Sequence, residues 1–169
     1  MNLAEALKAA IGYEARIRDL YRDAALAVHD EVGKRVLQVL QKEEQGHLDY
    51  LRDRLGEWQE NGKVQARQLK SILPNREDMK ESLQRARKTG PSAGRQDELA
   101  LLNQALELEK ETSDFYQSMI QKLDGEDQAL FEPFWEIEQG HVTVVQAEID
   151  SLRGLGYWYD FSEFDLEAG

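Results

Sequence analysis

The sequence predicts an all-α protein, a four-helix bundle built from two antiparallel helix hairpins. The chain has only three prolines, at positions 74, 91 and 133, and is otherwise rich in the helix formers Ala, Leu, Glu, Gln, Lys and Arg. Apolar and aromatic residues recur at a spacing of seven in four long stretches, as on the buried faces of amphipathic helices. At 169 residues, the chain is long enough for one domain with its own core.

Breaks in this helix-forming composition separate the four helices. The segment HDEVG at 29–33 ends the first helix, and the segment DGED at 124–127 predicts a turn between the last two. Pro133 follows within the first turns of the last helix, where proline is best tolerated. The helices are predicted from Leu3 to Val28, from the HDEVG break to Asn61–Gly62, from Asp97 to the DGED turn, and from that turn to Leu152.

A long crossover, residues 63–96, joins the two hairpins. It contains two of the prolines and a basic stretch, REDMKESLQRARK, which predicts a short helix of its own. Two hairpins joined by one long connection are typical of ferritin-like bundles, whereas up-down-up-down bundles have short loops throughout. We therefore expect a ferritin-like domain over residues 1–153, followed by an aromatic and acidic tail, 154–169, that packs on the bundle or on a dimer mate.

Each predicted helix carries one glutamate in the middle of its spacing-seven seam. A histidine follows three residues after the glutamate in the second and fourth helices, on the same helix face. The seams are Leu7-Glu14-Tyr21-Val28, Leu37-Glu44-Leu51-Trp58, Leu102-Glu109-Tyr116-Leu123 and Phe131-Glu138-Val145-Leu152.

The two halves of the chain repeat this arrangement. EEQGH ends at His47 and IEQGH ends at His141, an offset of 94 residues (141 − 47). Glu14 and Glu109 are 95 residues apart (109 − 14), and one loop residue accounts for the difference. The repeat indicates that both hairpins contribute equivalent groups to one interior site.

Four carboxylates facing one helix-bundle interior require positive charge, because buried unpaired charge is strongly destabilising. Two divalent cations would balance them, with two neutral imidazoles completing the ligand set. One Glu from each of two helices and Glu-x-x-His from each of the other two is the di-iron or di-manganese carboxylate pattern. These ligand types suit iron and manganese and do not exclude zinc. The predicted ligands are Glu14, Glu44, His47, Glu109, Glu138 and His141.

Four further polar residues lie close to these ligands in the sequence. Tyr21 and Tyr116 each follow a ligand glutamate by seven residues, and either hydrogen-bond a carboxylate across the bundle or serve as core aromatics. Asp19 and Asp114 could orient the histidines, but a solvated face is the favoured interpretation.

Other acidic and histidine side chains are expected to lie outside the site. Glu43, Glu107 and Glu111 are close to the ligands in sequence but off the seams, so we expect them to be solvated. His29 lies in the first break and is interpreted as a polar turn residue.

The ligand motifs resemble the rubrerythrin branch of the ferritin-like superfamily over residues 3–152, and the ending GYWYDFSEFDLEAG resembles the tails of small rubrerythrin-like proteins. The resemblance implies a homodimer with a non-haem di-iron centre that reacts with hydrogen peroxide or dioxygen in oxidative-stress defence. It implies that the bridging carboxylates are Glu44 and Glu138, or Glu44 and Glu109. Peroxide-reducing rubrerythrins have an extra glutamate where this chain has Thr112, whose hydroxyl could orient water or peroxide.

Composition limits the partners and the compartment. The formal charge is -12 and the pI about 4.7, so nucleic acids and anionic membranes are not expected partners. No secretory leader or membrane span is recognisable, and we expect a cytoplasmic protein. The chain has no cysteine, so it lacks the rubredoxin module of typical rubrerythrins and would need an external electron donor, such as a separate rubredoxin-like protein. Iron handling for storage or delivery, and a metal-dependent binding or sensing module, remain alternative functions.

Overall fold

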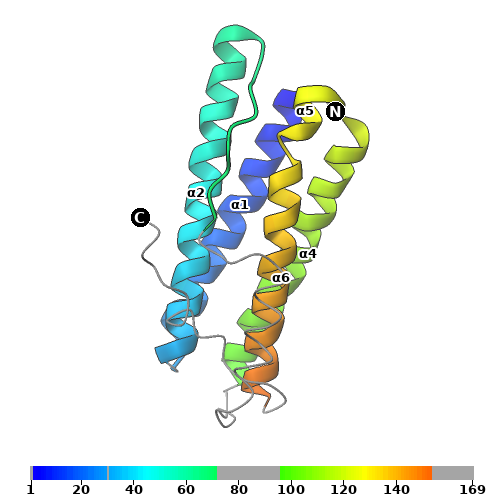
Figure 1. Cartoon of the computed structure of the whole chain (residues 1–169). Coiled ribbons are helices and arrows are strands. Elements are labelled where there is room, and N and C mark those ends of the chain that lie inside the picture. The colour runs from blue at the N-terminus through cyan, green and yellow to red at the C-terminus, as the bar shows by residue number, and fades with distance from the viewer. Residues whose placement is uncertain (1, 30, 72–95, 154–169) are drawn as a thin grey trace.

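The computed structural model describes residues 2–29, 31–71 and 96–153, and these residues form helices and connecting segments without strands. Four of the helices are long and pack against one another (Figure 1). This arrangement is compatible with the predicted four-helix bundle. The helices are α1 (Leu3–Ala27), α2 (Glu31–Asn61), α4 (Gln96–Lys122), the short α5 (Gly125–Ala129) and α6 (Glu132–Leu152).

Helices that are neighbours in sequence pack as pairs. α1 lies along α2 and α4 lies along α6, while α1 also packs against α4 and so joins the two pairs (Figure 1). α1 begins with a capping box in which the Asn2 side chain accepts a hydrogen bond from the Glu5 N–H, 2.9 Å, and the Asn2 N–H donates to the Glu5 carboxylate, 3.0 Å. The box satisfies backbone N–H groups that the first helical turn leaves without partners.

The predicted boundaries differ from the structure at the two short connections. α2 already begins at Glu31, inside the segment that we expected to be a break. The prediction of one continuous fourth helix after the turn was wrong, since α5 and α6 are separate helices. Pro133 explains this separation: in a continuous helix its ring would clash with the carbonyl of Ala129, which is where α5 ends. Pro133 instead occupies the first turn of α6, as expected.

Two apolar clusters fill the interior, one on each side of a polar layer. One cluster includes Ile17 and Leu40, and the other includes Tyr116, Phe131 and Phe134. In every long helix the predicted metal ligands lie in sequence between members of the two clusters. All positions of the four spacing-seven seams are buried apart from Trp58 and Leu123, which are partly buried, so the predicted seams are confirmed.

The first part of the crossover, residues 63–71, is extended and held against α2. The Tyr50 hydroxyl donates to the Arg67 carbonyl at 2.9 Å and accepts from the Arg67 N–H at 3.0 Å. The buried guanidinium of Arg54 donates to the Gln65 carbonyl at 3.1 Å. The predicted short helix at 76–88 and the C-terminal tail at 154–169 lie outside the described residues. Among the helices described, none combines the length and the apolar character needed to cross a membrane.

Candidate metal centre

The six predicted ligands meet in the middle of the helix bundle. α1 and α4 each contribute one glutamate, while α2 and α6 each contribute a glutamate and the histidine three residues further along. All six side chains are buried, and none is more than 1% exposed. They are Glu14, Glu44, His47, Glu109, Glu138 and His141.

These side chains form two overlapping groups. One contains Glu14 and His47, the other contains Glu109 and His141, and both include Glu44 and Glu138. In each group, one ligand atom per residue can be chosen so that all lie within 4.8 Å of one another. Each group is therefore compact enough to surround one cation, and the two carboxylates that belong to both can reach both positions.

The two imidazoles face the carboxylates in the same way. Nδ1 of His47 lies 3.2 Å from Glu14 and 3.0 Å from Glu44. Nδ1 of His141 lies 3.5 Å from Glu109 and 3.4 Å from Glu138. The rings are stacked with their centroids 5.6 Å apart. Each ring thus presents Nδ1 to the group of carboxylates on its own side.

Several atoms of this cluster are buried without a hydrogen-bond partner among the described residues. They include both carboxylate oxygens of Glu138, one each of Glu44 and Glu109, and both ring nitrogens of His141. Nδ1 of His141 is only 2.6 Å from a Glu44 oxygen, but the two atoms are not aligned for a hydrogen bond. Buried donors and acceptors normally have partners, and this set of oxygen and imidazole donors fits divalent iron or manganese.

Protons balance the charges of the cluster in the absence of metal. Burial and the negative charge of Glu138 raise the pKa of Glu14 and the pKa of Glu109 well above the ordinary value. Burial also acts to raise the pKa of Glu44, but the charges of His141 and His47 outweigh it and hold that pKa well below its ordinary value.

The pKa values of Glu138 and of the two histidines are shifted as well. Burial and Glu44 act to raise the pKa of Glu138, yet the interactions with His141 and His47 together leave that pKa lowered. Burial acts to lower the pKa of each histidine, but the surrounding glutamates together outweigh it, Glu44 first among them, so the pKa of His47 and that of His141 are raised well above the ordinary value. A cluster with Glu14 and Glu109 protonated, Glu44 and Glu138 ionised and both histidines charged would have no net charge. Two divalent cations and four carboxylates have none either.

Two tyrosines hydrogen-bond to glutamates across the cluster. The Tyr21 hydroxyl donates to Glu109, and the Tyr116 hydroxyl donates to Glu14. Both tyrosines are fully buried, and burial raises the pKa of the Tyr21 and Tyr116 hydroxyls well above the ordinary value. The hydrogen-bonding interpretation of these residues is confirmed. Each tyrosine hydroxyl keeps its proton. The two glutamates that they hold, Glu109 and Glu14, each belong to only one of the two ligand groups.

Thr112 is also buried beside the cluster, one helical turn after Glu109. Its hydroxyl donates a hydrogen bond of 2.8 Å to the Leu108 carbonyl of the same helix. In this rotamer the hydroxyl proton is already committed, so Thr112 can orient water or peroxide only as an acceptor.

Among the residues that we expected outside the site, Glu43 is the exception. Its side chain is buried, with the whole residue only 6% exposed, so the prediction that it is solvated was wrong. In a helix, Glu43 lies on the line of Val36, Leu40 and His47, a buried stripe beside the seam. This i, i+4, i+7 pattern was the sequence signal that could have identified it.

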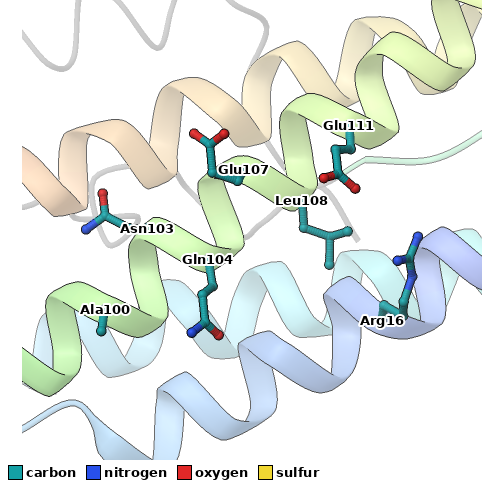
Figure 2. A pocket seen from close by; sticks show the side chains of 7 residues that line it. All are labelled: Arg16, Ala100, Asn103, Gln104, Glu107, Leu108 and Glu111. Carbon is teal, nitrogen blue, oxygen red and sulfur yellow. The ribbon is translucent and has the colours of Figure 1, made fainter.

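The other expected outsiders do lie away from the ligands. Glu107 and Glu111 are exposed on the outer side of α4, where they line a surface groove with Arg16 of α1 (Figure 2). Asp19 pairs with arginines at the surface, and Asp114 is exposed, so neither orients a histidine.

His29 lies in the turn between α1 and α2, as expected. Its N–H donates to the buried Glu98 of α4 at 2.9 Å, and its ring Nδ1 lies 2.7 Å from the same carboxylate oxygen. This residue therefore ties the first turn to the start of the second hairpin, well away from the ligands in sequence.

Comparisons with known proteins add evidence on the fold. No family model matches the chain, and no curated protein matches it. The structure is similar to that of a hypothetical protein from Pyrococcus furiosus, with a TM-score of 0.65, 24% sequence identity and 94% of each chain covered. At this level of identity the likeness supports the fold alone.

Proposed function

We propose that this chain is a ferritin-like di-iron carboxylate protein of the rubrerythrin type, an oxidoreductase that reduces hydrogen peroxide or dioxygen. The observation that carries the proposal is the pair of buried ligand groups that share Glu44 and Glu138. Two carboxylates common to two cation positions are suited to bridge them, and each position then has one further glutamate and one histidine. The duplicated Glu-x-x-His pattern matches that of di-iron carboxylate bundles.

Two ferrous ions held by these residues would supply the two electrons that reduce hydrogen peroxide to water, and would act as Lewis acids. The chain supplies the remaining requirements. Apolar clusters on both sides keep bulk water away from the centre. The Tyr21 and Tyr116 hydroxyls fix the orientation of Glu109 and Glu14, so these carboxylates need little rearrangement to bind a cation.

Anaerobic loading of the metal-free protein with ferrous iron, followed by mixing with hydrogen peroxide, tests this function. We expect rapid growth of near-ultraviolet absorption and consumption of about one peroxide per two ferrous ions, because each ion gives one electron. Glu109→Gln should abolish the rapid phase, whereas Glu107→Gln, at an exposed position of the same helix, should leave it intact. Oxidation no faster than that of ferrous iron in buffer would contradict the proposal.

Oxidation of iron for storage or delivery is the second candidate. It is favoured by the commitment of the Thr112 hydroxyl to the Leu108 carbonyl, which leaves no donor there to assist peroxide. The two functions differ in the fate of the iron. A peroxide-reducing centre would keep its oxidised iron on the chain until an external donor reduced it again, whereas an iron-handling protein would release the iron. Gel filtration after oxidation, with iron measured in the protein fraction, distinguishes them.

A further inference from the structure

The two ligand groups are alike on the Nδ1 side of their histidines, where the repeat places equivalent carboxylates, but they differ on the Nε2 side. EEQGH in α2 has Glu43 before its ligand glutamate, whereas IEQGH in α6 has Ile137 at the equivalent position. Glu43 is the carboxylate that lies off the seam and is nevertheless buried. The duplicated motif is therefore broken at one residue, and that residue is next to the centre.

Glu43 lies behind His141. Nδ1 of His141 faces the ligand carboxylates, while Nε2, the other ring nitrogen, lies 4.0 Å from Oε2 of Glu43. The same Glu43 oxygen accepts a hydrogen bond of 2.6 Å from the Ser71 hydroxyl. Glu43 is thus held between the crossover and the histidine.

No equivalent contact is found behind His47. Its Nε2 has no hydrogen-bond partner among residues 2–29, 31–71 and 96–153. Its ring instead meets the ring of Phe134 edge to face, with centroids 5.3 Å apart. An aromatic ring cannot accept a ring N–H as well as a carboxylate does.

A histidine that binds a cation through Nδ1 has its ring proton on Nε2. Metal-bound histidines usually donate that proton to a carboxylate, carbonyl or water, which fixes the ring and makes the ligand nitrogen more basic. The 4.0 Å between Nε2 of His141 and Glu43 exceeds a hydrogen bond by about 1 Å. The hydrogen bond would form if the imidazole and the Glu43 carboxylate approached each other by this distance.

We propose that Glu43, fixed by Ser71, is a positioning residue for His141 and makes the two metal positions unequal. The cation held by Glu109 and His141 binds more tightly than the cation held by Glu14 and His47. This inference rests on the proposed function, since it requires that the six ligands bind two cations. It also links the crossover to the centre, because Ser71 belongs to the segment, residues 63–71, that Tyr50 and Arg54 hold on α2.

Titration of the metal-free chain with cobalt(II), followed by visible absorption, tests the proposal. The wild type should take up cobalt in two resolved steps. Glu43→Leu, which removes the acceptor, should weaken the tighter step by about 10–100-fold and leave the weaker step unchanged. Glu43→Gln keeps an acceptor oxygen but not the charge, so its affinity for cobalt in the tighter step should lie between those of the wild type and Glu43→Leu. Ser71→Ala should weaken the same step by a smaller factor, and the exposed Glu107→Gln should change neither.

Proton NMR of the cobalt-loaded protein separates positioning from a general structural role. Two exchangeable imidazole N–H signals, shifted by cobalt, are expected from the two bound histidines. Glu43→Leu should move one signal and leave the other in place, since only His141 faces Glu43. General loosening of the centre would move both signals, and this would overturn the proposal.

The remaining outcomes are also decisive. A wild type that binds two cobalt ions in equal steps, or a Glu43→Leu variant with unchanged affinities, would overturn the inequality while leaving the proposed function intact. A wild type that binds no cobalt would remove the proposed function itself. If Glu43→Leu does not give a helical circular dichroism spectrum, Glu43→Gln and Ser71→Ala provide the test, and unchanged affinities in both would overturn the proposal.

Discussion

Metal binding to this centre should release protons, and the structure indicates how many. In the metal-free protein the pKa values of Glu14, Glu109, His47 and His141 are all raised well above their ordinary values, so each of these four groups keeps its proton to a higher pH than it would in water. Ligand atoms must lose their protons to bind a cation. Filling both positions should therefore release about four protons per chain.

The release sets the pH dependence of binding. Where all four groups are protonated, the product of the two binding constants should rise about 10⁴-fold for each pH unit, tenfold for each proton displaced. Calorimetric titration with cobalt(II), repeated in buffers of different ionisation enthalpy, measures the number of protons directly. Glu14→Gln removes one of the four and should lower the number to about three. Release of one proton or none by the wild type would refute the charge balance that we derive.

Three further predictions concern stability and the residues around the centre. The metal-free protein should lose stability as pH rises above about 4.5, because the raised pKa values of Glu14 and Glu109 mean that the folded state binds more protons than the unfolded one. Above about pH 6.5 the raised pKa values of His47 and His141 should add to this loss for the same reason. Thermal melting should show this fall for the metal-free form only, and an equal fall in the loaded form would contradict it. Tyr116→Phe should cost about 1–3 kcal/mol, since it removes the hydroxyl bound to buried Glu14, and urea unfolding should show less effect for the partly buried Tyr13→Phe. Leu40→Ala should cost about 2–5 kcal/mol through a cavity in the apolar cluster that contains Ile17 and Leu40, without changing the number of cations bound. Loss of a cation would contradict that separation.

Periodicity singled out the four glutamates because each lies on the spacing-seven seam of its helix, and it added the two histidines because each follows a seam glutamate by three residues on the same helix face. A spacing of seven returns to nearly the same helix face, so a glutamate flanked on that line by Leu7 and Tyr21 had to be buried. The same reasoning failed for Glu43, because a helix in a bundle buries a stripe wider than a single line of residues. The adjacent line through Leu40 and His47 is equally buried.

Contacts between helices depend on how the helices pack, which a single sequence does not specify. The resemblance to rubrerythrins left two choices for the carboxylate shared with Glu44, namely Glu138 and Glu109, and the spacing of the motifs could not decide between them. The structure places Glu138 in both ligand groups and Glu109 in one. Likewise, the approach of Ser71 to Glu43 joins residues 28 positions apart across an irregular segment, where no periodic pattern operates. The gathering of the six side chains in the interior was predictable from the sequence, but their pairing across the bundle was not.

The most direct test of the account is the amount of iron bound by three proteins after anaerobic reconstitution and removal of free iron. The wild type should hold about two irons per chain. Glu14→Ala removes a ligand from one group only and should hold about one. Glu44→Ala removes a ligand from both groups and should hold almost none. Two irons retained by Glu44→Ala, or none bound by the wild type, would contradict the claim that two cations share this carboxylate.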